Sequence, residues 1–421
     1  MRRLRGGSHR ERALRPSLVR CSTLALAFAT LSSCHDVPQA PITHPKPGPD
    51  WVRITMDDGV TDYPSWGGID FMTLADTEFD FVTAEEEYGS LHYGGCVQNC
   101  QDPARWMVGT IDSIYGGIGA NAASTRTSNG IAVAYEDWQG GTGQVKVGTC
   151  GGVCFLKTSW RLGVVRTGLI GSQFGTHSRA LAADPSGGLD LLYRGAPNGS
   201  SGIEYARCAS ACTDSASWQS MVLDSGTFLD YDDALTVAPS GTIHAVIEGG
   251  PGNGLTYLAC DSACTSRANW SSVQLDTGEV GATPSIQVGP NDALYVTYGS
   301  RSSGRPIAFV TCSSGCLNVA NWTRATLPAN AGTDISLLLD AAGQPWVATS
   351  YGYYKGTTVI LHCSAACSST GSWTTTSIDS LGDGRDIAMA LDVTGQPRLL
   401  VSGAGVHYAQ RPDTTVLAVK R

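Results

Sequence analysis

Twelve cysteines fall into six pairs spaced C-x3-C, and a tryptophan follows the second cysteine of each pair after six residues. Such thiols can either bind a metal or form disulfides. A structural metal site needs four converging ligands, often including histidine, but the pairs lie about 50 residues apart and no histidine recurs beside them. We therefore predict one disulfide within each pair: Cys96/Cys100, Cys150/Cys154, Cys208/Cys212, Cys260/Cys264, Cys312/Cys316 and Cys363/Cys367.

The same residues define an internal repeat. The tryptophans that follow the pairs are Trp106, Trp160, Trp218, Trp270, Trp322 and Trp373, and they lie 54, 58, 52, 52 and 51 residues apart. A period near 50 with strand-like content is typical of a propeller blade. Between a tryptophan and the next cysteine pair the chain reads as three short strands with turn signals such as Asp184-Pro-Ser-Gly187. If the tryptophan opens a fourth, outer strand, each repeat is one four-stranded blade.

The chain ends suggest how the ring closes. Residues 386–410 read as a three-strand unit without a tryptophan strand, whereas Trp51–Asp57 is a tryptophan strand without a unit before it. We therefore predict an all-β fold, a single seven-bladed propeller over residues 51–410, whose last blade is closed by the N-terminal strand. Closure of this kind leaves no sheet edge exposed.

Residues 1–33 have the features of a targeting segment. Seven arginines precede an apolar run, Leu24–Leu31, that is too short to span a bilayer, and Ser32-Ser33-Cys34 follows. This pattern resembles a bacterial lipoprotein signal, which implies lipidation of Cys34; an ordinary secretory signal cleaved nearby is the alternative. Residues 34–50, rich in proline, would form an extended tether, and residues 411–421 a C-terminal tail. We expect a lipid-anchored protein of the bacterial cell envelope, at the outer membrane or cell surface rather than the inner membrane.

The charge of the remaining chain restricts its partners. Removal of the seven arginines and one glutamate of the targeting segment from 28 basic and 37 acidic residues leaves a net charge of −15. Such an acidic domain disfavours nucleic acid and anionic lipid as partners. We expect a monomer that contacts the membrane through its lipid alone.

One polar position recurs six residues before the first turn of each unit. Its occupants are Asp70, Asn121, Ser178, Asp232, Thr283, Asp334 and Asp386. They open the innermost strands and should surround one mouth of the central channel. Such side chains often cap nearby backbone N–H groups. Alternatively, converging carboxylates would bind a hard cation such as Ca²⁺, with Asp70, Asn121, Asp232, Asp334 and Asp386 as candidate ligands.

Turns between the second and third strands should lie on the same face and form a binding rim. The segments Glu136–Trp138 and Glu248 belong to this expected rim. Its candidate binding residues are charged or aromatic: Glu86, Trp138, Arg194, Arg301 and Tyr354.

The repeats resemble the BNR/sialidase-like propeller repeats of bacterial exported proteins, through segments such as Ser336–Asp340 with Gly343, and Ile203–Cys208. Sialidases clamp a carboxylate with three arginines and use a tyrosine paired with glutamate. Arg179, Arg194, Arg301 and Arg385, with Tyr231 and Glu86, could supply these groups, but the family's S-x-D-x-G-x-T-W boxes are absent. We therefore expect a non-catalytic module that binds a glycan, peptide or protein. A sialidase-type glycoside hydrolase and an envelope assembly scaffold are the alternatives.

Overall fold

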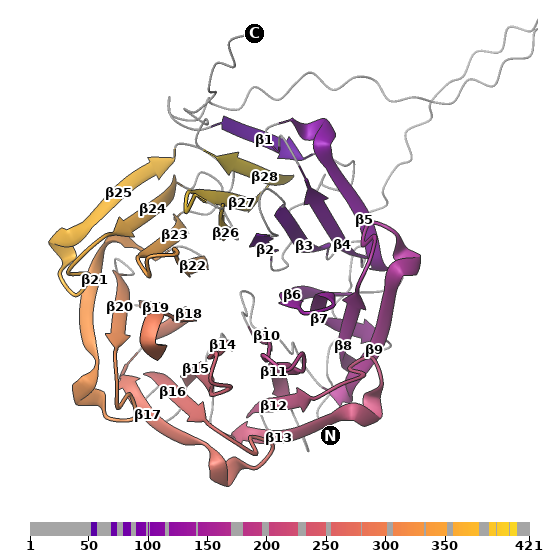
Figure 1. Ribbon diagram of the computed structural model, residues 1–421, viewed down its shortest axis with the longest axis horizontal. Coiled ribbons are helices and arrows are strands. Elements are labelled where there is room, and N and C mark those ends of the chain that lie inside the picture. The colour runs from indigo at the N-terminus through magenta and orange to yellow at the C-terminus, as the bar shows by residue number, and fades with distance from the viewer. Residues whose placement is uncertain are drawn as a thin grey trace, which may run out of the picture. The chain divides into compact units, whose positions relative to one another are not determined.

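A computed structural model describes the following residues: 52–56, 69–73, 79–85, 90–97, 100, 102–113, 118–139, 142–169, 180–195, 202–225, 233–249, 254–278, 280–300, 306–331, 334–351, 357–378, 387–392, 394–403 and 405–410. The described strands form seven four-stranded antiparallel sheets, which Figure 1 shows as blades around a common centre. The innermost strands contact one another in a closed cycle from β2 through β6, β10, β14, β18, β22 and β26 back to β2. The predicted all-β propeller with four-stranded blades is confirmed.

The strands are given from the inside outwards. Blades 1 and 2 contain β2 (Ile69–Thr73), β3 (Phe79–Glu85), β4 (Ser90–Cys96) and β5 (Trp106–Ser113), then β6 (Ile118–Thr127), β7 (Gly130–Gln139), β8 (Thr142–Cys150) and β9 (Trp160–Leu169). Blades 3 and 4 contain β10 (Leu181–Ala183), β11 (Leu189–Gly195), β12 (Gly202–Cys208) and β13 (Trp218–Asp224), then β14 (Asp233–Val237), β15 (Ile243–Gly249), β16 (Gly254–Cys260) and β17 (Ser271–Asp276).

Blades 5 and 6 contain β18 (Val280–Val288), β19 (Leu294–Ser300), β20 (Pro306–Cys312) and β21 (Thr323–Asn330), then β22 (Asp334–Leu339), β23 (Pro345–Tyr351), β24 (Thr357–Cys363) and β25 (Trp373–Ile378). Blade 7 contains β26 (Ile387–Leu391), β27 (Pro397–Gly403), β28 (Gly405–Gln410) and, as its outer strand, β1 (Val52–Met56). The predicted closure is confirmed, because β1 pairs with β28 from Val52 opposite Gln410 to Met56 opposite Val406.

Each tryptophan is fixed by a hydrogen bond that explains the constant spacing. Its indole Nε1 donates to the backbone oxygen of the second cysteine of its own pair, at 2.7 Å from Trp160 to Cys154 and 2.8 Å from Trp270 to Cys264. The same bond forms at 2.7–3.0 Å in the other four repeats, where the acceptors are the oxygens of Cys100, Cys212, Cys316 and Cys367. A short 3₁₀ helix lies between cysteine and tryptophan, so six residues bring the indole back to that carbonyl.

The tryptophans also pack between blades. Trp270 meets the ring of Tyr205 in the preceding blade edge-on, with centroids 5.0 Å apart, and Trp373 meets Phe309 in the same way at 4.8 Å. Aromatic pairs in this geometry add stabilisation beyond the area that they bury. The repeated tryptophan therefore joins its own cysteine loop to the neighbouring blade.

The prediction of one disulfide within each cysteine pair is confirmed at all six pairs. The two Cα atoms of each bridge lie 5.6–5.8 Å apart, and the bridges are Cys96–Cys100, Cys150–Cys154, Cys208–Cys212, Cys260–Cys264, Cys312–Cys316 and Cys363–Cys367. The first cysteine of each pair ends the third strand of its blade, and the second lies in the loop that follows. No bridge joins one blade to another among these twelve cysteines.

The disulfide loops nevertheless contact the neighbouring blades. Each loop leads into a 3₁₀ helix that contacts the outer strand of the preceding blade, as η2 (Lys157–Ser159) contacts β5 and η8 (Thr370–Ser372) contacts β21. At the latter junction the Thr370 hydroxyl donates to the Thr326 oxygen at 2.7 Å. The loops therefore connect successive blades without a covalent bond between them.

Two glycines permit this close approach. A Cβ on Gly109 of β5 would lie 2.0 Å from the Phe155 backbone oxygen, and one on Gly163 of β9 would lie 2.2 Å from that of Thr213. Both distances are far inside van der Waals contact, so these outer-strand positions require glycine where the next blade's loop crosses them.

Charged side chains also join neighbouring blades, near the ends of the outer strands that lie away from the disulfide loops. At the junction of blades 1 and 2, the Tyr135 hydroxyl donates to Asp112 at 2.8 Å, and Lys146 lies 3.2 Å from Asp112 and 2.7 Å from Asp137.

At the junction of blades 2 and 3 the charges are exchanged: Arg166 occupies the position of Asp112 and Glu204 that of Lys146. There the Tyr193 hydroxyl donates to Glu204 at 2.6 Å, and Arg166 lies 3.9 Å from the same carboxylate. Burial and the adjacent carboxylates raise the pKa of both tyrosines far above the ordinary value.

Among the residues that the structure describes, no helix is both long and apolar enough to cross a membrane.

Candidate functional site

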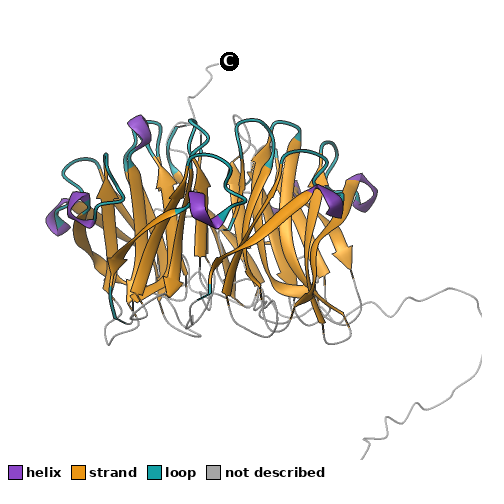
Figure 2. Cartoon of the chain, turned by 90° about the horizontal axis from the view of Figure 1, so that it is seen from below, coloured by secondary structure: helices purple, strands orange, loops and turns teal. Residues whose placement is uncertain are grey.

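The disulfide loops and the first turns of the blades share one face, here called the disulfide face. Figure 2 shows the 3₁₀ helices and the teal loops together on this side of the blades. The first turns are tight because an aspartate opens several of them. The Asp340 carboxylate accepts from the amides of Ala342 at 2.9 Å and Gln344 at 2.8 Å, and Asp184 and Asp392 act in the same way. Aspartate in this role fixes a turn by replacing backbone acceptors.

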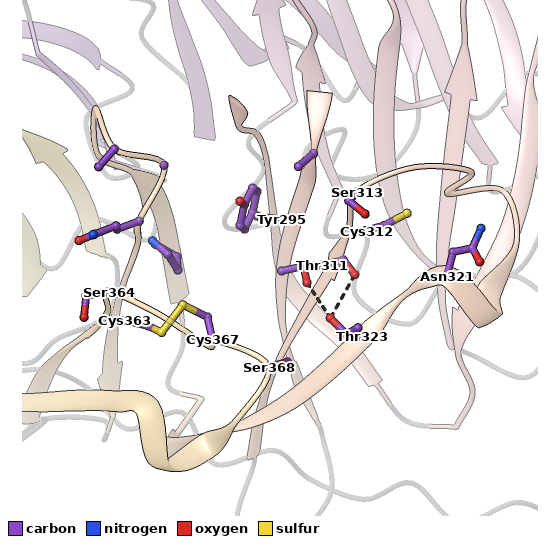
Figure 3. A pocket seen from close by; sticks show the side chains of 15 residues that line it. Tyr295, Thr311, Cys312, Ser313, Asn321, Thr323, Cys363, Ser364, Cys367 and Ser368 are labelled. Carbon is purple, nitrogen blue, oxygen red and sulfur yellow. Dashed lines mark hydrogen bonds between the residues drawn. A yellow bond between two sulfur atoms is a disulfide. The ribbon is translucent and has the colours of Figure 1, made fainter. Parts of the chain in front are cut away.

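One pocket of about 410 Å³ opens on the disulfide face between blades 5 and 6. Blade 5 contributes the half-buried ring of Tyr295 and the hydroxyls of Thr311 and Thr323, which are 2.7 Å apart. Blade 6 contributes its first turn, including Gln344, and its disulfide loop with Ser364 and the Cys363–Cys367 bridge (Figure 3). The fifteen residues that line this pocket are all uncharged. Its surface therefore offers an aromatic ring, hydroxyls and amides.

A second pocket of about 400 Å³ lies between blades 4 and 5. Blade 4 contributes His244, Ser271 and Asp261, and the Thr242 hydroxyl donates to Asp261 at 2.9 Å. Blade 5 contributes its first turn with Asn291 and Asp292, and its disulfide loop with Cys316. Both turn residues have positive φ, 58° and 57°, although glycine occupies the position of Asp292 in the turns that end at Gly187, Gly241, Gly343 and Gly395. Such conformations of non-glycine residues tend to occur at functional sites.

The two pockets are copies of one arrangement. Three neighbouring positions on adjacent strands line each of them: the second residue of the second strand, the residue before the first cysteine, and the residue after the tryptophan. In blade 5 these are Tyr295, Thr311 and Thr323; in blade 4 they are His244, Ala259 and Ser271. Asn321 and Asn269, also equivalent, line the pockets and hold their disulfide loops through bonds to Gly315 at 3.0 Å and Ala263 at 2.9 Å.

In blades 3 and 6 these positions hold side chains that pair with one another. In blade 3, Arg207 lies 3.4 Å from Asp190 and 2.6 Å from Asp184. In blade 6, Trp346 and His362 stack with their ring centroids 3.9 Å apart. The same three positions thus carry an aromatic ring and hydroxyls in blade 5, an ion pair in blade 3 and stacked rings in blade 6.

The histidine of the blade 4/5 pocket is neutral at physiological pH. His244 Nδ1 lies 2.7 Å from the Tyr257 hydroxyl, and the two rings stack at 6.0 Å. Burial lowers the pKa of His244 to about 4, and the carboxylates of Asp261 and Asp292 only partly oppose this effect. Burial also raises the pKa of Tyr257 above its ordinary value. Asp261 and Asp292 are therefore the charged side chains among this pocket's lining residues.

The structure describes the side chain of Asp334, one of the residues predicted to surround the channel mouth. It begins β22 and is buried; Oδ1 accepts from its neighbour Ile335 at 2.7 Å, and Oδ2 accepts from Ile387 of the next blade at 3.1 Å. This is the capping role, and it connects two innermost strands. Thr283 is also buried, in β18. The backbones of Asp70 and Asn121 lie in β2 and β6, whereas Ser178, Asp232 and Asp386 lie outside the described residues.

No group of three or more potential metal ligands occurs among the described side chains. The calcium site stays a prediction for a ring of which the structure describes only part.

The predicted rim needs a correction. Glu136, Asp137 and Glu248 were expected in exposed turns, but they lie within β7 and β15 and are 0–1% exposed. The strands extend further than the turn signals suggest, as the pairing of β7 with β8 up to Gln139 shows. Trp138 belongs to β7 and half-buried Arg194 to β11. Glu86, Arg301 and Tyr354 lie outside the described residues, as do Cys34, Arg179, Arg385 and Tyr231.

Three of the described arginines engage separate carboxylates. Arg207 pairs with Asp184, Arg398 lies 2.6 Å from Asp392, and Arg324 pairs with Asp276. The first two pairs lie within blades 3 and 7 and the third joins blades 4 and 5, so these three arginines do not form a common anion clamp within the part of the chain that the structure describes.

No protein-family model matches the chain, and no curated protein matches it. Solved structures are similar in fold. The BP39L lectin of Burkholderia pseudomallei matches over 82% of this chain and 98% of its own, with 13% identity and a TM-score of 0.53. An ulvan lyase of polysaccharide lyase family PL25 matches over 83% and 91%, with 9% identity and a TM-score of 0.54.

The NanB sialidase of Streptococcus pneumoniae matches over 85% of this chain and 70% of its own, with 13% identity and a TM-score of 0.45. At these identities the similarities to the lectin and the lyase show the fold alone. A shared propeller fold says nothing about activity.

Sequence reasoning missed the residues that line the two pockets. A signal was present at the second residue of the second strand, or the third in the longer β7, because the residue type at this position varies between repeats: Asp80, Ala132, Asp190, His244, Tyr295, Trp346 and Arg398. Change at one position of an otherwise regular scaffold marks a place where the scaffold does not determine the residue.

Proposed function

We propose that this protein is a carbohydrate-binding module whose ligand sites are the two equivalent pockets on the disulfide face. The observation that carries the proposal is the repetition of one pocket at neighbouring junctions, lined in blade 5 by an aromatic ring beside hydroxyl and amide groups. Sugars present both an apolar face and several hydroxyls, so they match such a surface. Small-molecule sites commonly combine an apolar wall with a few polar groups.

The lectin and the polysaccharide lyase among the similar structures make carbohydrates the first ligand class to test. Two similar sites on one face would also allow a branched or long glycan to bind twice, which increases avidity without a new contact. A peptide or protein ligand is the outcome if glycans fail to bind.

A glycan array probed with the full chain tests the proposal, followed by calorimetry on the strongest ligand. Tyr295→Ala removes the aromatic ring from the blade 5/6 pocket, and Thr323→Gln places a larger side chain among its lining residues. Each variant should weaken binding at this pocket by about tenfold or more, since loss of one well-packed aromatic anchor commonly has this effect.

Thr374→Gln is the matched control. Thr374 follows Trp373 as Thr323 follows Trp322, is also exposed on an outer strand, and lines neither pocket. Binding that is equally weak in the Thr323 and Thr374 variants, or unchanged in Tyr295→Ala, would place the ligand outside the blade 5/6 pocket.

The proposed setting is the bacterial cell envelope, with Cys34 lipidated and residues 34–50 as a tether. Six disulfides are consistent with an oxidising, exported environment. Cys34→Ala should release the domain from membranes or leave the precursor uncleaved. Normal cleavage together with unchanged membrane fractionation would contradict lipid anchoring.

A further inference from the structure

The charges of the two pockets restrict the kind of carbohydrate that they accept. The blade 5/6 pocket is lined by uncharged residues, so a ligand carboxylate or sulfate would lose its hydration there without gaining a counter-charge. Burial of a charge without a partner is strongly unfavourable, whereas a neutral hydroxyl can exchange water for threonine, serine or asparagine partners.

The blade 4/5 pocket differs in one respect. Asp261 and Asp292 line it, neither lysine nor arginine is among its lining residues, and His244 remains neutral. Asp261 is held at the pocket by the Thr242 hydroxyl, and Asp292 by the first turn of blade 5. An anionic sugar would be repelled by both carboxylates, whereas an ammonium group would be attracted.

We propose that the pockets select carbohydrates by charge: both exclude anionic sugars, the blade 5/6 pocket takes neutral ones, and the blade 4/5 pocket prefers an amino sugar with a free ammonium group. This inference rests on the proposed glycan binding. A ligand charge about 6 Å from a carboxylate changes affinity roughly threefold per carboxylate in a water-like medium, so two carboxylates give about tenfold. The net charge of the propeller acts in the same direction at longer range.

The test compares three classes of immobilised glycan with the full chain at low and at high salt. Neutral glycans are represented by cello- and xylo-oligosaccharides, amino sugars by chitosan oligosaccharides, and anionic sugars by polyuronates and sialylated glycans. We expect signal from the neutral and amino classes, with the amino preference reduced about tenfold at 1 M salt, where charges are screened beyond about 3 Å. The anionic class should give at least about tenfold less signal than the neutral class at low salt.

The variant Asp261→Asn/Asp292→Asn separates the two pockets. It should remove the preference for amino sugars, whereas binding of neutral glycans in the blade 5/6 pocket should stay within about twofold, because neither residue lines that pocket. The double variant Asp102→Asn/Asp214→Asn is the control. These two exposed aspartates lie on disulfide loops, accept from Ala104 and Ala216, and line neither pocket, but they change the net charge equally.

Each outcome has a distinct meaning. Equal or stronger binding of the anionic class would overturn this inference and leave carbohydrate binding intact. An amino preference that survives Asp261→Asn/Asp292→Asn, or is lost equally in the control, would overturn its assignment to the blade 4/5 pocket. Absence of signal from all three classes would overturn both this inference and the proposed function.

Discussion

The indole Nε1 of Trp270 donates a 2.8 Å hydrogen bond to the Cys264 oxygen, while the same ring packs edge-on against Tyr205 of the preceding blade at 5.0 Å. One side chain thus holds its own disulfide loop and contacts the preceding sheet. The disulfide, the tryptophan and the blade contact form a single unit that recurs around the ring. This unit gives the first prediction.

Trp270→Phe should lower the free energy of unfolding by about 2–4 kcal/mol. The variant loses one hydrogen bond, leaves a buried carbonyl without its donor, and removes part of a ring that is 5% exposed. Urea denaturation measures the change. Met107→Leu, at a side chain that is 47% exposed, is the control and should shift stability by less than about 0.5 kcal/mol. Similar effects of both changes would show that the indole bond contributes little.

Ala263 gives a prediction of the opposite sign. It precedes the second cysteine of its loop with φ of 49°, as do Ala211 and Ala366 with φ of 54°, and the equivalent residue in blade 5 is Gly315. A left-handed conformation costs an alanine about 1 kcal/mol, so Ala263→Gly should leave stability unchanged or raise it by up to about 1 kcal/mol. Ala216→Gly, in a 3₁₀ helix without positive φ, should instead destabilise by about 0.5–1 kcal/mol in the same urea titration.

Much of this architecture could be predicted from the sequence, because the signals were repeated. Six copies of the cysteine–tryptophan spacing gave the blade, its outer strand and its disulfide, and Trp51 at the same phase gave the closure. The outer strand begins at Trp106 and Trp160 as predicted, but one residue after Trp270 and Trp322. These small errors reflect frayed strand ends, which spacing alone does not determine.

The candidate site could not be predicted from the repeats, because it depends on where they differ. Tyr295 lines its pocket together with Thr311, Thr323 and the first turn of blade 6, which lies about 50 residues further along the chain. Glu136 and Glu248 were expected at the surface because charge usually indicates solvent, and their burial follows from strand length. A single sequence does not show which residues meet across strands and blades.

The buried charges between blades 1 and 2 give the third prediction. Lys146→Met would leave Asp112 and Asp137 without their shared cation, so we expect a loss of about 3 kcal/mol in unfolding free energy. Arg105→Met is the matched control, since Arg105 and Asp102 are 3.9 Å apart with side chains 60% and 53% exposed. Removal of such a surface pair should cost no more than about 0.5 kcal/mol. Equal losses in the two variants would contradict the structural role of the buried network.

His244 gives the fourth prediction, a dependence of stability on pH. Its pKa is lowered from the usual 6.5 to about 4 in the folded protein, mainly by burial. Between these values the unfolded chain binds a proton that the folded chain does not, so this residue makes stability fall as the pH drops from 6.5 towards 4. His244→Gln should therefore gain stability relative to the wild type over that range, by roughly 2–4 kcal/mol. Urea midpoints at pH 7.5 and 4.5 measure the difference, and a constant difference would contradict a neutral buried histidine.

Asp190 should show the opposite sign in nearly the same pH range. This carboxyl is fully buried in β11, and burial raises its pKa to about 6 although Tyr205 and Arg207 donate to it. Because the folded chain then retains its proton at a higher pH than the unfolded chain, this residue makes stability fall as the pH rises from about 4 to 6. Asp190→Asn keeps an acceptor for Tyr205 but does not titrate, so its stability relative to the wild type should increase by roughly 2 kcal/mol over that interval. The same urea titrations at pH 4 and 7 measure it. A relative stability that decreases instead would mean that the ion pair with Arg207 outweighs the effect of burial and keeps Asp190 ionised.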